Sequence, residues 1–186
     1  MNAAISNRVP TTTILSQIKT ALAALQINIG GNPATAFARV EQFDNENLGE
    51  AFQRLFISEQ RICLVVVLDE QFKKENNSQK MIITRTLPVT LLISDRQLGS
   101  RLDALYGNAT TPGAFALMEA VLPIVTGMLI PPAAPLSGVT CEPVNNTVIV
   151  IKDNEKQNLP GRAAVALELH CLGGNLQANL GPQPVL

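Results

Sequence analysis

Reactive side chains are scarce in this sequence, and that scarcity excludes most catalytic mechanisms. His170 is the single histidine in 186 residues, so every mechanism that needs an imidazole depends on it. Glu168 lies two residues earlier, on the same face of an expected alternating strand. A catalytic metal normally needs three protein ligands, and nothing nearby in the sequence supplies a third. We therefore interpret Glu168 and His170 as a solvated polar pair.

The motifs of nucleotide-binding enzymes and of hydrolases are also missing. The sequence contains no GxxxxGK[ST] loop, no GxGxxG turn and no GxSxG elbow. Asp69 and Glu70 follow one expected strand, and Asp153 with Glu155 follows another. Carboxylates at strand ends can hold Mg²⁺, but no phosphate-binding loop accompanies these. We expect solvated loop charges here, and we predict no catalytic residue, no metal and no cofactor.

Charge is sparse and almost balanced. The chain has 14 Lys and Arg against 15 Asp and Glu, for a net charge of -1, which gives no electrostatic basis for binding nucleic acid or an anionic membrane. The longest uncharged stretch, residues 120–141, contains four prolines and cannot form the roughly 20-residue helix that crosses a bilayer. Residues 1–10 lack the apolar core of a secretory signal, so we expect the mature chain to begin near here.

The three cysteines are Cys63, Cys141 and Cys171. Their spacings are far too wide for a zinc or redox motif of the CxxC type. Each lies in an apolar segment, where a free thiol behaves as a small hydrophobic side chain. An odd count without an export signal favours a reducing cytoplasm. We predict three buried free thiols.

Hydrophobic periodicity predicts a single α+β domain over residues 1–174, with helices packed on a mixed, mostly antiparallel sheet. The expected helices cover residues 12–27, a short segment after Asn45, residues around 98–105, and a segment from Pro112 that Thr111 caps. The expected strands cover residues 36–41, 62–68, 81–94, 139–144, 147–152 and 163–172. Residues 71–80 and 153–161 are predicted loops, and Asn145-Asn146 is a predicted tight hairpin turn. Residues 175–186 are predicted to be a flexible tail.

The longest predicted strand alternates most clearly. Apolar residues fall on one face, with Arg85 as the single charged interruption, and small polar residues fall on the other. The apolar positions are Met81, Ile83, Leu87, Val89, Leu91 and Ile93. The helix that follows changes to steps of three and four residues. Its predicted buried stripe consists of Phe115, Leu117, Met118, Val121, Leu122, Val125 and Leu129.

One segment carries a family resemblance. After the long strand come Arg96, Gln97, Leu98 and Gly99, and then Gly113, Ala114, Phe115, Leu117, Met118, Glu119 and Val121. This order resembles the tail terminator proteins of Mu-like and related phages and prophages. The resemblance extends over residues 12–172, although only residues 95–122 are specific. Pro123 inside the helix and the long uncharged tail after Gly173 depart from the family pattern.

The resemblance implies an α+β fold and a structural role in the virion. A tail terminator forms a hexameric ring on the growing tail tube, stops polymerisation and offers its other face to the head–tail connector proteins. The implied partners are therefore further copies of the chain, the tube protein and the connector proteins. The implied location is the virion tail, assembled in the cytoplasm of a bacterial host.

Protein-binding surfaces are expected in three places, and they leave alternatives open. The expected loop residues are Phe72, Lys73, Lys74, Asn76 and Asn77, and the expected ridge at residues 129–136 contains Pro131, Pro132 and Pro135. The C-terminal tail could add a strand to a neighbouring sheet. The alternatives to a tail terminator are a head–tail connector or tail completion protein, and a small metal-dependent hydrolase that uses Glu168 and His170.

Overall fold

The computed structural model describes residues 9–43, 61–77, 80–95, 101–130, 138–151, 162–173 and 176–179. Within these ranges the helices are α1 (Thr11–Ala23), α3 (Arg101–Tyr106) and α4 (Gly113–Val125). The strands are β1 (Gln26–Ile29), β2 (Asn32–Thr35), β3 (Arg39–Phe43), β4 (Ile62–Val67), β5 (Gln71–Asn77), β6 (Lys80–Ser94), β7 (Met128–Ile130), β8 (Val139–Ile151), β9 (Arg162–Gly173) and β10 (Leu176–Asn179). The predicted α+β class is confirmed.

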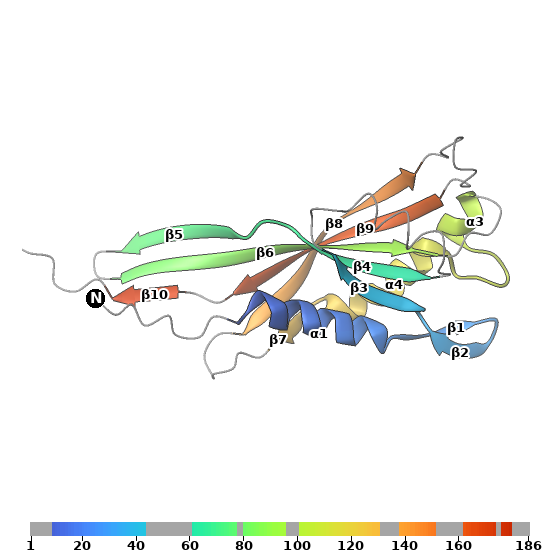
Figure 1. Cartoon of the computed structure of the whole chain (residues 1–186), viewed down its shortest axis with the longest axis horizontal. Helices are drawn as coiled ribbons and strands as arrows, with labels where there is room; N and C mark the ends of the chain where they lie inside the picture. Colours follow the sequence, from blue (N-terminus) through green and yellow to red (C-terminus); the bar gives the residue numbers. More distant parts are fainter. Residues whose placement is uncertain are drawn as a thin grey trace, which may run out of the picture.

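The main sheet is built around β6. The strand order is β3-β4-β6-β9-β8-β7, and every pairing is antiparallel except that of β3 with β4. Residues 89–94 of β6 pair with β4, and residues 86–93 pair with β9. Its first half instead pairs with β5 on one side and β10 on the other. Figure 1 shows β5, β10 and this half of β6 projecting beyond the helices, and we call these three strands the arm.

The core lies between the helices and one face of the sheet. Alternate residues of β6 are fully buried there, which confirms the predicted period of two, and each buried aliphatic side chain of this size contributes about 1.5–3 kcal/mol. The main contributors are Leu87, Val89, Leu91 and Ile93 of β6, Ile14, Ile18 and Leu22 of α1, Leu117 and Val121 of α4, and Val165, Leu167 and Leu169 of β9. A smaller cluster on the opposite face contains Ile62, Leu64, Val66 and Leu92.

The strand predicted at residues 62–68 is confirmed, whereas the helix predicted at residues 12–27 is too long. β4 lies between β3 and β6, and residues 62–66 are all buried. α1 ends at Ala23, and the chain turns into the β1–β2 hairpin that the sequence did not predict. Gly30 and Gly31 have φ angles of 57° and 84°, as a two-residue hairpin turn with two positive φ angles demands. These glycines therefore make the hairpin turn and do not end the helix.

Residues 71–80 do not form the predicted loop. Residues 71–77 form β5, which pairs along β6 from Thr86 to Lys80. The polar sequence suggested a loop because apolar alternation is the usual sign of a strand. Residues 71–74 of β5 are all exposed, so burial imposes no such alternation on them, and main-chain hydrogen bonds to β6 hold the strand.

Two further predictions fail in the last third of the chain. β8 runs unbroken through Asn145 and Asn146, which pair with Glu168 and Leu167, so the predicted hairpin is wrong. A shift of register between Pro143 and Asn145 leaves Val144 as an extra residue, which is a β-bulge. The predicted flexible tail also contains a strand, because β10 pairs with residues 80–83 of β6. The helix predicted after Asn45 and the loop predicted at 153–161 lie outside the described residues.

Between α3 and α4, the backbone at Gly107 packs closely against the backbone at Gly113. Gly107 follows the last residue of α3, and Gly113 is the first residue of α4. Each of these glycines has a φ of 79°. A Cβ atom on Gly113 would lie 2.2 Å from the backbone nitrogen of Gly107, and a Cβ on Gly107 would lie 2.3 Å from the carbonyl oxygen of Pro112. Both positions therefore require glycine for its conformation and for its size.

We expect Gly113→Ala to lower the free energy of unfolding by about 3 kcal/mol or more, because it adds a backbone clash to the cost of a positive φ. Gly127→Ala is the matched control. Gly127 has a φ of 68° but open space around its Cβ position, so a loss of about 1 kcal/mol is expected. Urea unfolding of both variants measures the difference. Equal losses would show that the contact between the two glycines is not tight.

Candidate interaction surface

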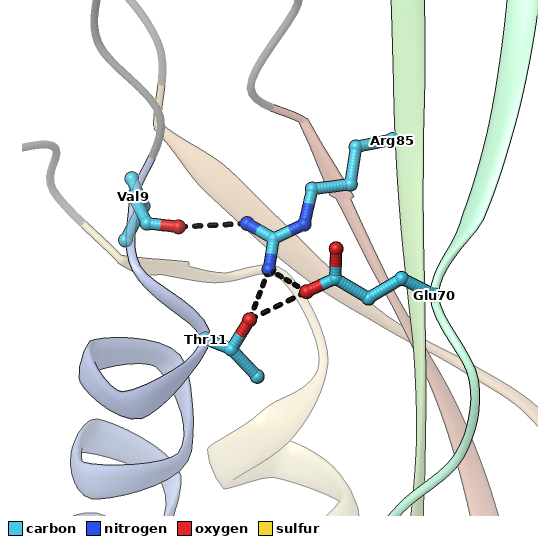
Figure 2. A network of polar contacts seen from close by, with 4 residues as sticks. All are labelled: Val9, Thr11, Glu70 and Arg85. Carbon is cyan, nitrogen blue, oxygen red and sulfur yellow. Dashed lines mark hydrogen bonds and ion pairs between the residues drawn. The ribbon is translucent and has the colours of Figure 1, made fainter.

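A buried arginine connects the arm to the body of the protein (Figure 2). The Arg85 side chain is 2% exposed, and its Nη1 donates to the carbonyl oxygen of Val9 at 2.7 Å. Its Nη2 donates to Thr11 Oγ1 and to Glu70 Oε1, both at 2.5 Å. Thr11 Oγ1 also donates to Glu70 Oε1 at 2.5 Å. The single charge on the apolar face of β6 thus joins the start of α1 to the segment between β4 and β5.

The Arg85 contacts correct the interpretation of Glu70 as a solvated loop charge. The Glu70 side chain is 18% exposed and forms an ion pair with Arg85. A buried charge without a counter-charge is strongly unfavourable, so the two residues must fold together. The sequence signal for Arg85 was its position on an otherwise apolar face. No local pattern identified its partners, because Thr11 is 74 residues away along the chain.

A second buried acid holds the beginning of α4. Asp95, which is 2% exposed, accepts a hydrogen bond from the backbone nitrogen of Gly113 at 2.6 Å through Oδ2. Thr111 was predicted to cap this helix, but its Oγ1 contacts the side-chain oxygen of Asn108 at 3.1 Å. Pro112 takes the N-cap position without a side-chain cap bond. The cap therefore comes from 18 residues upstream, a distance that local capping patterns do not cover.

The predicted contact residues are divided between the arm and the undescribed part of the chain. Phe72, Lys73 and Lys74 lie on β5 and are exposed, with Phe72 at 52%. Asn76 and Asn77 lie further along the same strand. Pro131, Pro132 and Pro135, the prolines of the expected ridge, lie outside the described residues.

Several large apolar side chains are exposed elsewhere on the described surface. Leu102 and Tyr106 of α3 are each 67% exposed. The Tyr106 ring stacks on Phe115 of α4, with ring centroids 5.4 Å apart. Leu129, which was predicted to extend the buried stripe of α4, lies on β7 and is 65% exposed. Val144, the bulge residue of β8, is 54% exposed.

The candidate catalytic pair lies at the surface of the sheet. His170 Nε2 is 3.3 Å from Glu168 Oε1, and both side chains of the pair are about one third exposed, at 31% and 39%. No group of three or more His, Cys, Asp or Glu side chains in the described ranges could hold a metal ion. Asp153 and Glu155 lie outside these ranges. Among the described helices, none is long and apolar enough to cross a membrane.

The three cysteines are buried and free, as predicted. Burial raises the pKa of the Cys63 thiol on β4. Cys141 of β8 and Cys171 of β9 are directly opposite each other, and their sulfur atoms are 3.2 Å apart. The hydrogen bond between them lowers the pKa of Cys141 and raises that of Cys171. Sequence spacing could not reveal this pair, because strand register decides which residues meet.

No protein-family model matches this chain, and no curated protein is detectably similar to it in sequence. The candidate surface is therefore defined by geometry: the arm, the open edges of the sheet and the exposed apolar side chains.

We expect Arg85→Met to lower the free energy of unfolding by about 3–5 kcal/mol, because it leaves Glu70 without its counter-charge. Arg39→Met is the control, since Arg39 pairs with Glu41 at the surface and its side chain is 46% exposed. Exposed pairs of this kind contribute less than about 1 kcal/mol. Denaturant unfolding compares the two. Similar losses would mean that burial adds nothing to the Arg85 ion pair.

Proposed function

We propose that this protein is a tail terminator, a structural virion protein that forms a hexameric ring on the end of a phage tail tube. The ring would stop tube polymerisation and present the surface that joins the head. The sequence resemblance at residues 95–122 is the first support. Within this segment, Asp95 accepts a 2.6 Å hydrogen bond from the backbone nitrogen of Gly113, the first residue of the second matching group.

The arm is the structural observation that carries the proposal. Its strands extend beyond the helices that cover the core (Figure 1). Ordering a ribbon outside the core costs conformational entropy, and the described side chains of β5, residues 71–74, are all exposed within the subunit. Contact with a neighbouring molecule would supply the missing burial. Phe72 is suited to this role, because it lies opposite Arg85 on the arm face that continues the core, yet it is half exposed.

The open edges of the sheet suggest how copies would join. Among the described strands, β5 pairs with β6 alone, and the part of β8 beyond Cys141 pairs with β9 alone. Unpaired strand edges accept another strand readily. A contact between two different edges is heterologous, and it closes into a ring when the rotation between subunits fits. Lys74 on β5 and Glu142 on β8 are both exposed and opposite in charge.

The charge of the chain is compatible with this role. A ring subunit packs mainly against protein, and a net charge of -1 neither drives copies strongly apart nor attracts the DNA that would pass through the ring. The location that follows is the virion tail, assembled in the cytoplasm of the host.

Deleting the gene from its phage or prophage tests the proposal directly. We expect negative-stain microscopy of the lysate to show overlong tails without heads, because polymerisation has lost its stop. Tails of normal length without heads would assign the protein to head–tail joining instead. Intact infectious particles would contradict any structural role in the virion.

Complementation of the deletion with variants tests the arm. We expect Phe72→Asp to fail to restore infectious particles, because it places a charge on the proposed contact face. Gln71→Asp is the matched control, since it adds the same charge to the adjacent residue, which points to the opposite face of the arm. His170→Ala should complement fully. Loss of function in His170→Ala with full function in Phe72→Asp would favour a hydrolase. Circular dichroism checks that each variant is folded.

A further inference from the structure

Two strands of the sheet bring a pair of thiols together in the core. Cys141 of β8 and Cys171 of β9 are directly opposite in the antiparallel register. Both residues are buried, at 0% and 1% exposure, and their sulfur atoms are 3.2 Å apart. The two residues are 30 positions apart in the sequence, so only the fold places them in contact.

The backbone geometry at this pair suits a disulfide bond. Directly opposed residues in antiparallel strands have Cα atoms about 4.5–5.5 Å apart. Disulfides join residues whose Cα atoms are about 4.4–6.8 Å apart, so the strands need not separate or slide to form one. The sulfur atoms must approach each other by only about 1 Å to reach bonding distance.

The two thiols differ in reactivity, and the third thiol provides a contrast. The hydrogen bond with Cys171 lowers the pKa of Cys141 and favours its thiolate, the nucleophilic form. The same contact raises the pKa of Cys171. Cys63 on β4 is separated from this pair by β6, and burial alone raises its pKa. Cys63 is therefore an inert internal reference.

We propose that Cys141 and Cys171 are a redox pair that a small peroxide converts into a disulfide across β8 and β9. The Cys141 thiolate attacks one oxygen of hydrogen peroxide, the O–O bond breaks, and hydroxide leaves, which gives a sulfenic acid on Cys141. The Cys171 sulfur then loses its proton and attacks the Cys141 sulfur, and the S–O bond breaks with loss of hydroxide. Two thiols are oxidised, and one peroxide is reduced to two waters.

The disulfide would fix one end of a long pair of strands. It would close the chain between Cys141 and Cys171 into a loop, and it would hold β8 to β9 next to the point where β7 joins the sheet at Cys141. The timing of this step rests on the proposed function. In a virion protein the pair would stay reduced during assembly in the cytoplasm and would oxidise after release from the cell.

Treatment of the purified full-length protein with hydrogen peroxide, under native conditions, tests the proposal. After alkylation and digestion without reductant, we expect mass spectrometry to find a Cys141–Cys171 cross-link and an alkylated Cys63. Cys63→Ala should form the cross-link at an unchanged rate. Cys171→Ala removes the hydrogen bond that activates Cys141, so we expect no cross-link and an oxidation of Cys141 as slow as that of Cys63. In the unsubstituted protein, oxidation of Cys63 as fast as Cys141, or a cross-link that appears only after unfolding, would overturn the proposal.

Thermal unfolding gives a second readout. We expect the disulfide to raise Tm by roughly 5–10 °C, because it constrains the unfolded chain, and dithiothreitol should reverse the shift. Cys141→Ala should show no shift on peroxide treatment. A cross-linked protein with a lower Tm would mean that the native geometry resists the bond. All of these measurements use the isolated protein, so their failure would leave the proposed role in the tail untouched.

Discussion

The buried guanidinium of Arg85 is the contact on which the arrangement of the arm and the body depends. It lies where β6 leaves the core, and its acceptors come from the segment before α1 and from the bend between β4 and β5. Because an unpaired charge cannot remain buried, these separate segments are tied to one geometry. Among the described residues, Arg85 Nε is the only buried side-chain nitrogen or oxygen atom that has no hydrogen-bond partner. The other two nitrogens are satisfied by three partners.

Burial determines which parts of the fold the sequence could predict. The alternation of β6 and β9 and the continuous apolar run of β4 were read correctly, because each of these strands has a face or both faces in the core. α4 was found for the same reason, although Leu129 falls beyond the end of the helix, on β7. Where one face of a strand or helix is buried in the core, apolar residues recur with the period of that element, and its position can be predicted from the sequence.

The predictions that failed concern features set by strand register and by residues far apart in the sequence. Residues 71–74 of β5 are all exposed, so no buried period reveals this strand, and β8 continues through Asn145-Asn146 with a bulge at Val144. The cap from Asp95 and the contact between Cys141 and Cys171 both arise from chain pairings that local sequence does not encode. Of the residues predicted to contact partners, Phe72 and Lys74 are exposed on a paired strand, which fixes the direction of each side chain, and their role stays a prediction.

β6 has a mechanical consequence that follows from its length. One unbroken strand of 15 residues belongs to the arm at its first half and to the core at its second. Asp95 follows its last residue and holds the first backbone nitrogen of α4. A load applied to the arm is therefore carried along an extended chain, which is stiff in tension, to the first turn of α4. β6 therefore connects the arm mechanically to the start of α4.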